Sequence, residues 1–174
     1  MTHSIEILKF ETDHGLGARA RLGLIVLQTD QTIEHDFARI FSNENDVSLH
    51  VARIPNAMEV SPRTLRQMAV DLPLTAELLP SQFGFDVVGY GCTSGATLIG
   101  EEEVGKLIRD IHPEVATTNP ITATKAALSA LGTTKIALLT PYPVGVTMRM
   151  QANLEASGFA IIAVGTFGQS DDFT

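Results

Sequence analysis

The sequence predicts an α/β protein with a mostly parallel sheet. Short apolar runs rich in Val, Ile and Leu alternate with longer stretches in which apolar residues recur at helical spacing. This strand-helix alternation occurs five times and ends on a further strand, a pattern typical of parallel sheets with helical crossovers. The 174 residues are 44% hydrophobic and 18% charged, which is the composition of a globular chain.

Each expected strand is a short run of apolar or β-branched residues. The first, Leu22–Leu27, is almost wholly apolar, as is typical of a parallel strand buried on both faces. The second, Val47–Ile54, alternates apolar and polar side chains and stops at Pro55. The remaining strands are expected at Phe85–Tyr90, Val115–Thr118, Lys135–Thr140 and Phe159–Val164.

The expected helices carry their apolar residues at helical spacing or begin with recognisable caps. Ser61-Pro62 and Asn119-Pro120 each combine a capping side chain with a proline at the first helical position. Pro73 is expected to kink or break the helix that begins at Pro62, because proline removes a backbone donor. The Asn119-Pro120 start leads into a helix at Ile121–Leu131, and the other helices are expected at Thr32–Phe41, Glu101–Ile111 and Val144–Ser157.

Composition excludes several classes of function. The net charge of −8 argues against nucleic-acid binding, which usually needs a basic face. One cysteine excludes an internal disulfide and a multi-cysteine zinc site, and the histidines lack metal-ligand spacing, so no metal site is predicted. No apolar run approaches the ~20 residues of a membrane span, and the first residues lack a signal peptide's features. We therefore expect a cytoplasmic protein with no membrane partner.

Two glycine-rich segments resemble nucleotide-binding motifs without meeting their requirements. Gly15–Ala20 precedes the first strong strand, whereas a dinucleotide fingerprint follows one. Gly100–Lys106 has the spacing of a phosphate loop, but Leu107 replaces the required Ser or Thr and three glutamates line the loop. No cofactor is predicted.

The segment Gly91–Gly95 carries the strongest chemical signal. Parallel α/β proteins bind ligands beyond the carboxyl ends of their strands, and Cys92 follows one of these ends directly. The two glycines let backbone amides approach a ligand, and Thr93 and Ser94 add hydroxyl donors. A free cysteine is often a small buried hydrophobe, but this position favours a reactive thiol.

Four segments together resemble a known family. The sequence is similar to the aspartate/glutamate racemase superfamily, and most closely to its branch of maleate cis-trans isomerases, arylmalonate decarboxylases and ectoine-utilisation proteins. The G-C-T-S-G run is the most specific part of a resemblance that covers about residues 21–174. The segments are Arg21–Val26, Thr29–Glu34, Gly89–Gly95 and Thr140–Tyr142.

The resemblance also implies an architecture. It predicts two pseudo-symmetric three-layer α/β units with mostly parallel sheets, of which the second is incomplete in this chain. We expect an N-terminal arm at residues 1–20, a first unit carrying the cysteine loop at 21–114, and the start of a truncated second unit at 115–174. The family uses a second cysteine in its C-terminal half, and this sequence has none.

The resemblance assigns roles to four residues. Cys92 matches the family's first catalytic cysteine. Thr93 and Ser94 match the groups that hold a substrate carboxylate, and Tyr142 matches a tyrosine that donates a hydrogen bond to the same carboxylate.

Two further substrate-binding candidates fit less directly. Asp30 falls where maleate isomerases have an asparagine that contacts substrate, and an aspartate there repels a dicarboxylate unless it is protonated. Asn119 follows a strand end and is expected near the cleft, although its plain interpretation is a helix N-cap.

The predicted function is that of a cofactor-independent isomerase or racemase similar to maleate isomerase. Its substrate is expected to be a small carboxylic acid, with a dicarboxylic acid favoured, and a homo-oligomer is compatible with the family pattern. Three alternatives stay open: a decarboxylase of malonate-type acids, an ectoine-utilisation-type protein, and a carboxylate-binding protein without turnover.

Overall fold

Two parallel sheets organise the chain, whose computed structural model describes residues 5–13 and 15–171. Residues 1–4 and 14 of the expected arm, and 172–174 of the expected second unit, lie outside the described part. Within the described residues one sheet has four parallel strands and the other has two, so the predicted α/β class is confirmed. The first sheet, in the order β2-β1-β3-β4, consists of β1 (Ala20–Leu27), β2 (Val47–Ile54), β3 (Val87–Tyr90) and β4 (Ala116–Thr118). The second pairs β5 (Lys135–Thr140) with β6 (Ala160–Thr166).

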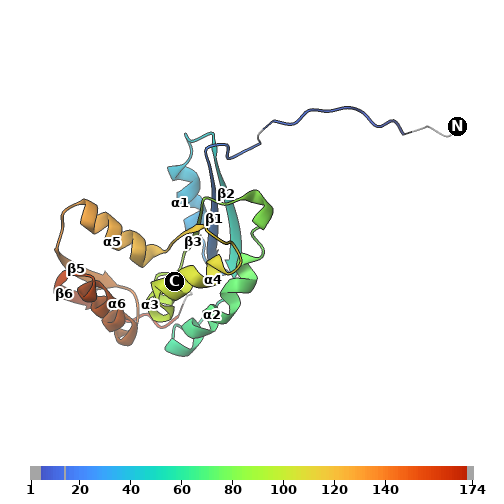
Figure 1. The fold of residues 1–174 in the computed structure, drawn as a ribbon. Helices are drawn as coiled ribbons and strands as arrows, with labels where there is room; N and C mark the ends of the chain where they lie inside the picture. Colours follow the sequence, from blue (N-terminus) through green and yellow to red (C-terminus); the bar gives the residue numbers. More distant parts are fainter. Residues whose placement is uncertain (1–4, 14, 172–174) are drawn as a thin grey trace.

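The five expected helices follow the strands in the predicted order, and a further helix at Thr93–Ile99, which was not predicted from the sequence, precedes the one at Glu101. Both expected proline starts are confirmed, since Ser61 caps the helix that begins at Pro62 and Asn119 caps the one that begins at Pro120. Figure 1 shows α5, α6 and the second sheet as a lobe beside the first sheet. The helices are α1 (Ile33–Ile40), α2 (Pro62–Ala76), α3 (Thr93–Ile99), α4 (Glu101–Arg109), α5 (Pro120–Ala130) and α6 (Val144–Ala156), with a short 3-10 turn η1 (Ser81–Phe83).

The strand register brings the carboxyl ends of the strands in the first sheet to the same end of that sheet. Leu27 at the end of β1 pairs with Ile54 at the end of β2, and Ile25 pairs with Tyr90 at the end of β3. Ile25, Ile54 and Tyr90 are fully buried, so the core reaches right up to this end. The loops that leave these strands therefore converge, which is the placement that ligand sites in parallel sheets require.

The helix α2 does not break at Pro73, although a break is one of the two outcomes that the sequence predicts there. It continues through Pro73 to Ala76, so the expected break is absent. Leu72 and Ala76 on either side are fully buried, and the Glu77 N–H donates to the Pro73 carbonyl at 3.1 Å. Packing on both sides of the proline thus outweighs the single backbone hydrogen bond that it removes.

The strand β4 belongs to the first sheet. The sequence places Val115–Thr118 at the start of a second unit, but Val87, Val88 and Gly89 of β3 pair in parallel with β4. The expected boundary at residues 114/115 therefore does not coincide with the division between the two sheets. The pairing partner of so short a strand is a tertiary property that its local pattern does not encode.

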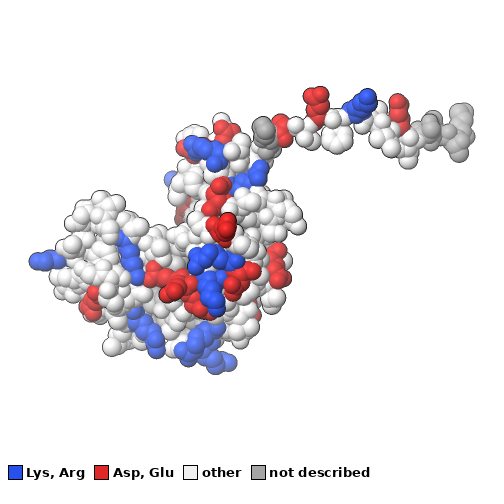
Figure 2. Space-filling view, viewed as in Figure 1, with Lys and Arg blue, Asp and Glu red and all other residues white. Residues whose placement is uncertain are grey.

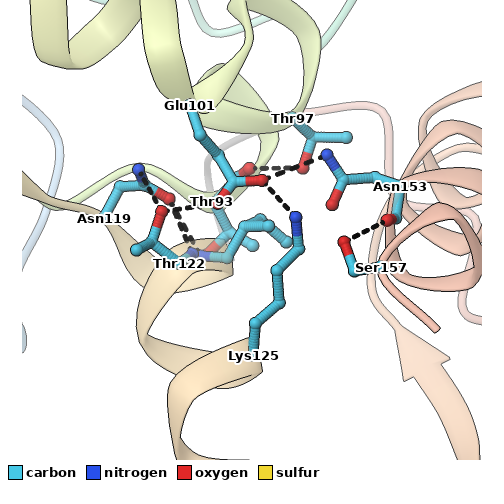
Figure 3. Close-up of polar contacts among 9 residues, drawn as sticks. Thr93, Thr97, Glu101, Asn119, Thr122, Lys125, Asn153 and Ser157 are labelled. Carbon is cyan, nitrogen blue, oxygen red and sulfur yellow. Dashed lines mark hydrogen bonds and ion pairs between the residues drawn. The ribbon is translucent and has the colours of Figure 1, made fainter. Parts of the chain in front are cut away.

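A polar cluster around Glu101 joins the lobe to the first sheet's helices. Glu101 opens α4, and its carboxylate accepts hydrogen bonds from Thr122 and Lys125 of α5 and, at 3.2 Å, from Asn153 of α6. Figure 3 shows these side chains converging on the carboxylate. Burial raises the pKa of Glu101, but the hydrogen bonds from Lys125, Thr122 and Asn153 outweigh it and lower that pKa overall.

We expect Glu101→Gln to destabilise the fold by about 1–2 kcal/mol at pH 7, less than for a fully buried pair because the Glu101 and Lys125 side chains keep about a fifth of their surface exposed. The folded-state pKa lies below the ordinary value of 4.5, so the stabilisation is present above that value and is lost as pH falls through the folded-state pKa. Denaturant unfolding of the unaltered chain and of Glu101→Gln between pH 7 and pH 3 measures this difference in the free energy of unfolding. Glu103→Gln, at an exposed position on the same helix, is the matched control. Equal effects of the two substitutions on the free energy of unfolding at pH 7 would contradict a stabilising role for the Glu101 carboxylate.

Candidate functional site

Cys92 occupies the junction between β3 and α3. It is the N-cap of α3, and its Sγ accepts a hydrogen bond from the Gly95 backbone N–H at 3.3 Å. The Ser94 hydroxyl lies 3.6 Å from the same sulfur. The helix begins directly at Thr93, so most of the expected Gly91–Gly95 loop is helical. A donated N–H stabilises a thiolate, whereas burial of the side chain, which is only 3% exposed, opposes its ionisation.

Tyr90 supports the cysteine from the end of β3 and is a residue that sequence reasoning missed. Its side chain hydrogen-bonds with Cys92, and its hydroxyl lies 3.5 Å from the Met68 sulfur. Burial raises the pKa of Tyr90, and the adjacent Cys92 raises it further, so Tyr90 stays a protonated donor. A signal was present, because residues two apart in an extended segment face the same side.

Gly95 makes this contact possible. A Cβ at position 95 would lie 2.4 Å from the Tyr90 hydroxyl oxygen and 3.0 Å from the Cys92 sulfur. Any larger residue would therefore displace one of the two groups. The glycine is required by close approach between the helix backbone and the side chains of Tyr90 and Cys92.

A small cavity lies against Cys92. Its volume is about 10 Å³, which is about the space of one water molecule. Cys92 and Ser94 line it together with Asn56, and a carboxylic acid can enter only if lining residues move apart. The remaining lining residues are Leu27, Ala57, Glu59, Val60, Thr64, Leu65 and Met68.

Asn56 is a second residue that sequence reasoning missed. It follows Pro55 at the end of β2, and its Nδ2 donates to the Thr29 hydroxyl at 3.0 Å. The amide therefore links the loops after β1 and β2 at the wall of the cysteine cavity. The rule that ligands bind beyond the carboxyl ends of strands could have identified it.

A larger hollow of about 380 Å³ adjoins the cysteine cavity, since Leu27 and Val60 line both. Asp30 and Tyr142 lie together in its wall. The structure thus brings two predicted site residues from distant parts of the chain beside the cavity that holds Cys92 and Ser94. The other lining residues are Thr29, Gln31, Thr32, Pro141, Gln169 and Asp171.

Asp30 also has a structural task. Its Oδ1 accepts hydrogen bonds from the backbone N–H groups of Thr32 and Ile33, each at 2.9 Å, and so caps the start of α1. Thr32, the residue before α1, makes no side-chain cap of its own. A carboxylate at this helix start is electrostatically favourable and is held at the rim of the hollow.

Thr93 and Asn119 line neither the cavity nor the hollow. The Thr93 carbonyl accepts from the Thr97 hydroxyl at 2.8 Å. Asn119 caps α5, with its Oδ1 accepting from the N–H groups of Ile121 and Thr122, both at 3.1 Å. Figure 3 shows Asn119 turned toward this helix start. The structure therefore supports the plain N-cap interpretation of Asn119, and a substrate contact for either residue stays a prediction.

The charged side chains that line the site are all acidic. Of the described residues that line the cavity and the hollow, none is Lys or Arg, whereas Asp30, Glu59 and Asp171 are acidic. Across the described part of the chain, no three His, Cys, Asp or Glu side chains are grouped to hold a metal ion. None of the helices described here is long and apolar enough to cross a membrane.

Comparison with known proteins shows a shared fold. No protein-family model and no curated protein match the chain. A maleate cis-trans isomerase mutant from Nocardia farcinica with a covalently bound succinylcysteine intermediate is 24% identical, with a TM-score of 0.75 over 87% of this chain and 65% of that one. A maleate isomerase mutant from Pseudomonas putida S16 with maleate is 22% identical, with a TM-score of 0.73 and the same coverage.

A liganded arylmalonate decarboxylase mutant is also similar, at 21% identity and a TM-score of 0.72 over 87% of this chain and 63% of that one. The chain therefore spans less than two thirds of the length of these solved structures. The predicted resemblance to the maleate isomerase and arylmalonate decarboxylase branch is confirmed at the level of the fold.

Proposed function

We propose that the Cys92 site belongs to a cofactor-independent isomerase or racemase that acts on a small carboxylic acid. The observation that carries this proposal is the setting of the thiol. Cys92 is buried where the strands of a parallel sheet end, accepts a hydrogen bond from the Gly95 backbone N–H and is hydrogen-bonded with the Tyr90 side chain. A covalent succinylcysteine in a Nocardia farcinica protein of the same fold supports covalent chemistry at such a site.

The proposed step for an unsaturated acid is addition of the thiolate to the double bond. The sulfur forms a C–S bond, and the π electrons move onto the carbon beside the carboxylate, as an enolate. Rotation then occurs about a single bond, after which the electron pair reforms the double bond and expels the thiolate. The Ser94 hydroxyl and the Asn56 amide line the same cavity, where they can donate hydrogen bonds to the developing charge.

The fold shared with arylmalonate decarboxylase supports decarboxylation as a second candidate. In that step the electrons of a C–C bond stay on the substrate as carbon dioxide leaves, and the Cys92 thiol protonates the resulting enolate. Both candidates need a polarised carboxylate and a cysteine at the reacting carbon, so the same residues serve either reaction.

Proton NMR in deuterated water separates these reactions in one experiment. We would incubate the protein separately with maleate, a phenylmalonate and a chiral α-substituted carboxylic acid. Conversion of maleate to fumarate or deuterium exchange at the α-carbon supports an isomerase or racemase, whereas loss of carbon dioxide from the malonate supports the lyase. Ligand-induced stabilisation without any product would contradict both and indicate a binding protein.

We expect Asp30→Asn to improve the use of doubly charged acids. Asparagine keeps a side-chain oxygen for the N–H groups of Thr32 and Ile33, so α1 stays capped while one negative charge leaves the hollow. Two like charges about 4 Å apart in water repel by about 1 kcal/mol, so KM for a dicarboxylate should fall by up to about fivefold.

The matched control is Asp36→Asn, which removes the same charge from the first turn of α1, at an exposed position that does not line the hollow. Initial rates with a dicarboxylate and a monocarboxylate measure the effect. An equal change for both substrates, or an equal change in both variants, would contradict a role for Asp30 in charge selection.

A further inference from the structure

Residues 5–13 form an extended arm that carries four large apolar side chains. Figure 1 shows this arm leaving the body of the molecule next to β1 and β2. Its large apolar side chains are almost entirely in water, with exposed fractions of 98% for Ile5, 95% for Ile7, 73% for Leu8 and 84% for Phe10. Full burial of such a side chain is worth about 1.5–3 kcal/mol, so the arm gains much by docking on a surface.

A groove of about 650 Å³ lies at the root of the arm, on the edge of the first sheet. Its apolar wall contains Leu16, Val47, Leu49 and Phe83. Among the described strands β2 is outermost in its sheet, so its outer edge presents backbone groups without a neighbouring strand. Edges of this kind accept an added strand readily.

The arm matches this edge in pattern, length and charge. Its run from Ile5 to Glu11 is rich in β-branched and aromatic residues, as strands are, and is nearly as long as the eight-residue β2. The arm carries Glu6, Glu11 and Asp13 against a single lysine, Lys9, and is therefore net negative, whereas the groove wall carries Arg21. Figure 2 shows that the arm bears charges of both signs between uncharged residues.

We propose that the arm of one copy docks along β2 and into this groove of a second copy, reciprocally, to form a two-fold dimer. The occupant is a second copy because the chain's own arm points away from its body and leaves its apolar side chains exposed. Reciprocal exchange buries the apolar side chains of both arms and fills both grooves. This is the self-complementary contact that a two-fold axis produces. This proposal is independent of the reaction at Cys92.

Intermolecular cross-linking tests the pairing directly. Ile7→Cys protein is mixed with Gln82→Cys protein, since Gln82 is an exposed residue of the groove wall. After oxidation, a disulfide that joins positions 7 and 82 can form only between two copies, and peptide mass spectrometry identifies it. We expect this heterodisulfide as the main cross-link. Its absence from a mixture that still contains dimers would overturn the proposal.

Sedimentation velocity provides the second measurement. The double variant Ile7→Asp/Phe10→Asp should sediment as a monomer at concentrations where the unaltered chain is a dimer. Its dimer dissociation constant should be at least about tenfold higher. The matched control Ile7→Val/Phe10→Leu keeps apolar side chains and should stay dimeric. An unaltered chain that is monomeric at 100 µM, or a dimer that survives the aspartates, would overturn the proposal.

Discussion

Replacement of Cys92 by serine should reduce turnover of every accepted acid by at least about a thousandfold, or about 4 kcal/mol of activation free energy. An alcohol is a far weaker acid than a thiol, so serine supplies almost no anion to add to a double bond or to accept an α-proton. The loss should appear in kcat rather than in KM, because the hydrogen-bond donors that we propose hold the carboxylate remain.

The serine variant is also expected to fold normally. Serine is a preferred N-cap residue, so it can accept the Gly95 N–H that the sulfur accepts in the unaltered chain. Thermal unfolding should therefore change little, which separates a chemical loss from a folding defect. Wild-type turnover in a folded Cys92→Ser protein would show that the reaction does not use this thiol.

Gly95→Ala should impair both the site and the fold. The added methyl would lie 2.4 Å from the Tyr90 hydroxyl and 3.0 Å from the Cys92 sulfur, so one of them must move. Tyr90 is fully buried and has little room to shift. Overpacking of this kind costs about 1–3 kcal/mol, and displacement of the thiol by a fraction of an ångström should lower kcat by about tenfold to a hundredfold.

Gly145→Ala is the matched control for this prediction. Gly145 also lies within a helix, α6, but a Cβ there meets no atom within 4 Å. Alanine should be neutral or stabilise the protein by up to about 1 kcal/mol through its higher helix propensity. Unfolding free energies and initial rates of the two variants measure the contrast. Equal stability and activity in both would show that the close packing at Gly95 is not required.

Local sequence patterns predicted the elements well and their tertiary relations less well. Strand order along the chain and the proline starts of α2 and α5 follow from short-range signals, and they are confirmed. The unbroken α2 depends on the burial of Leu72 and Ala76, and the pairing of β4 depends on a distant strand. Neither property can be read from the residues around it.

The candidate site shows the same division. Cys92 and Ser94 line one cavity, and Asp30 and Tyr142, which were chosen from the family resemblance, line the adjoining hollow. Tyr90 was not predicted as a site residue, because an aromatic side chain at the end of an apolar strand is typical of the core. Its contact with the thiol depends on the absence of a side chain at Gly95. The catalytic and substrate-binding roles themselves stay predictions, since they concern chemistry that local pattern does not encode.

The central claim is that the Cys92 thiolate forms a bond to the substrate, and peptide mass spectrometry after rapid acid quenching tests it most directly. The unaltered chain would be mixed with maleate, quenched within one turnover and digested. The account predicts a mass increase of one substrate molecule on the peptide that contains Cys92, and no increase in the Cys92→Ser variant. Product formation without any adduct on Cys92, or the same adduct in the serine variant, would contradict it.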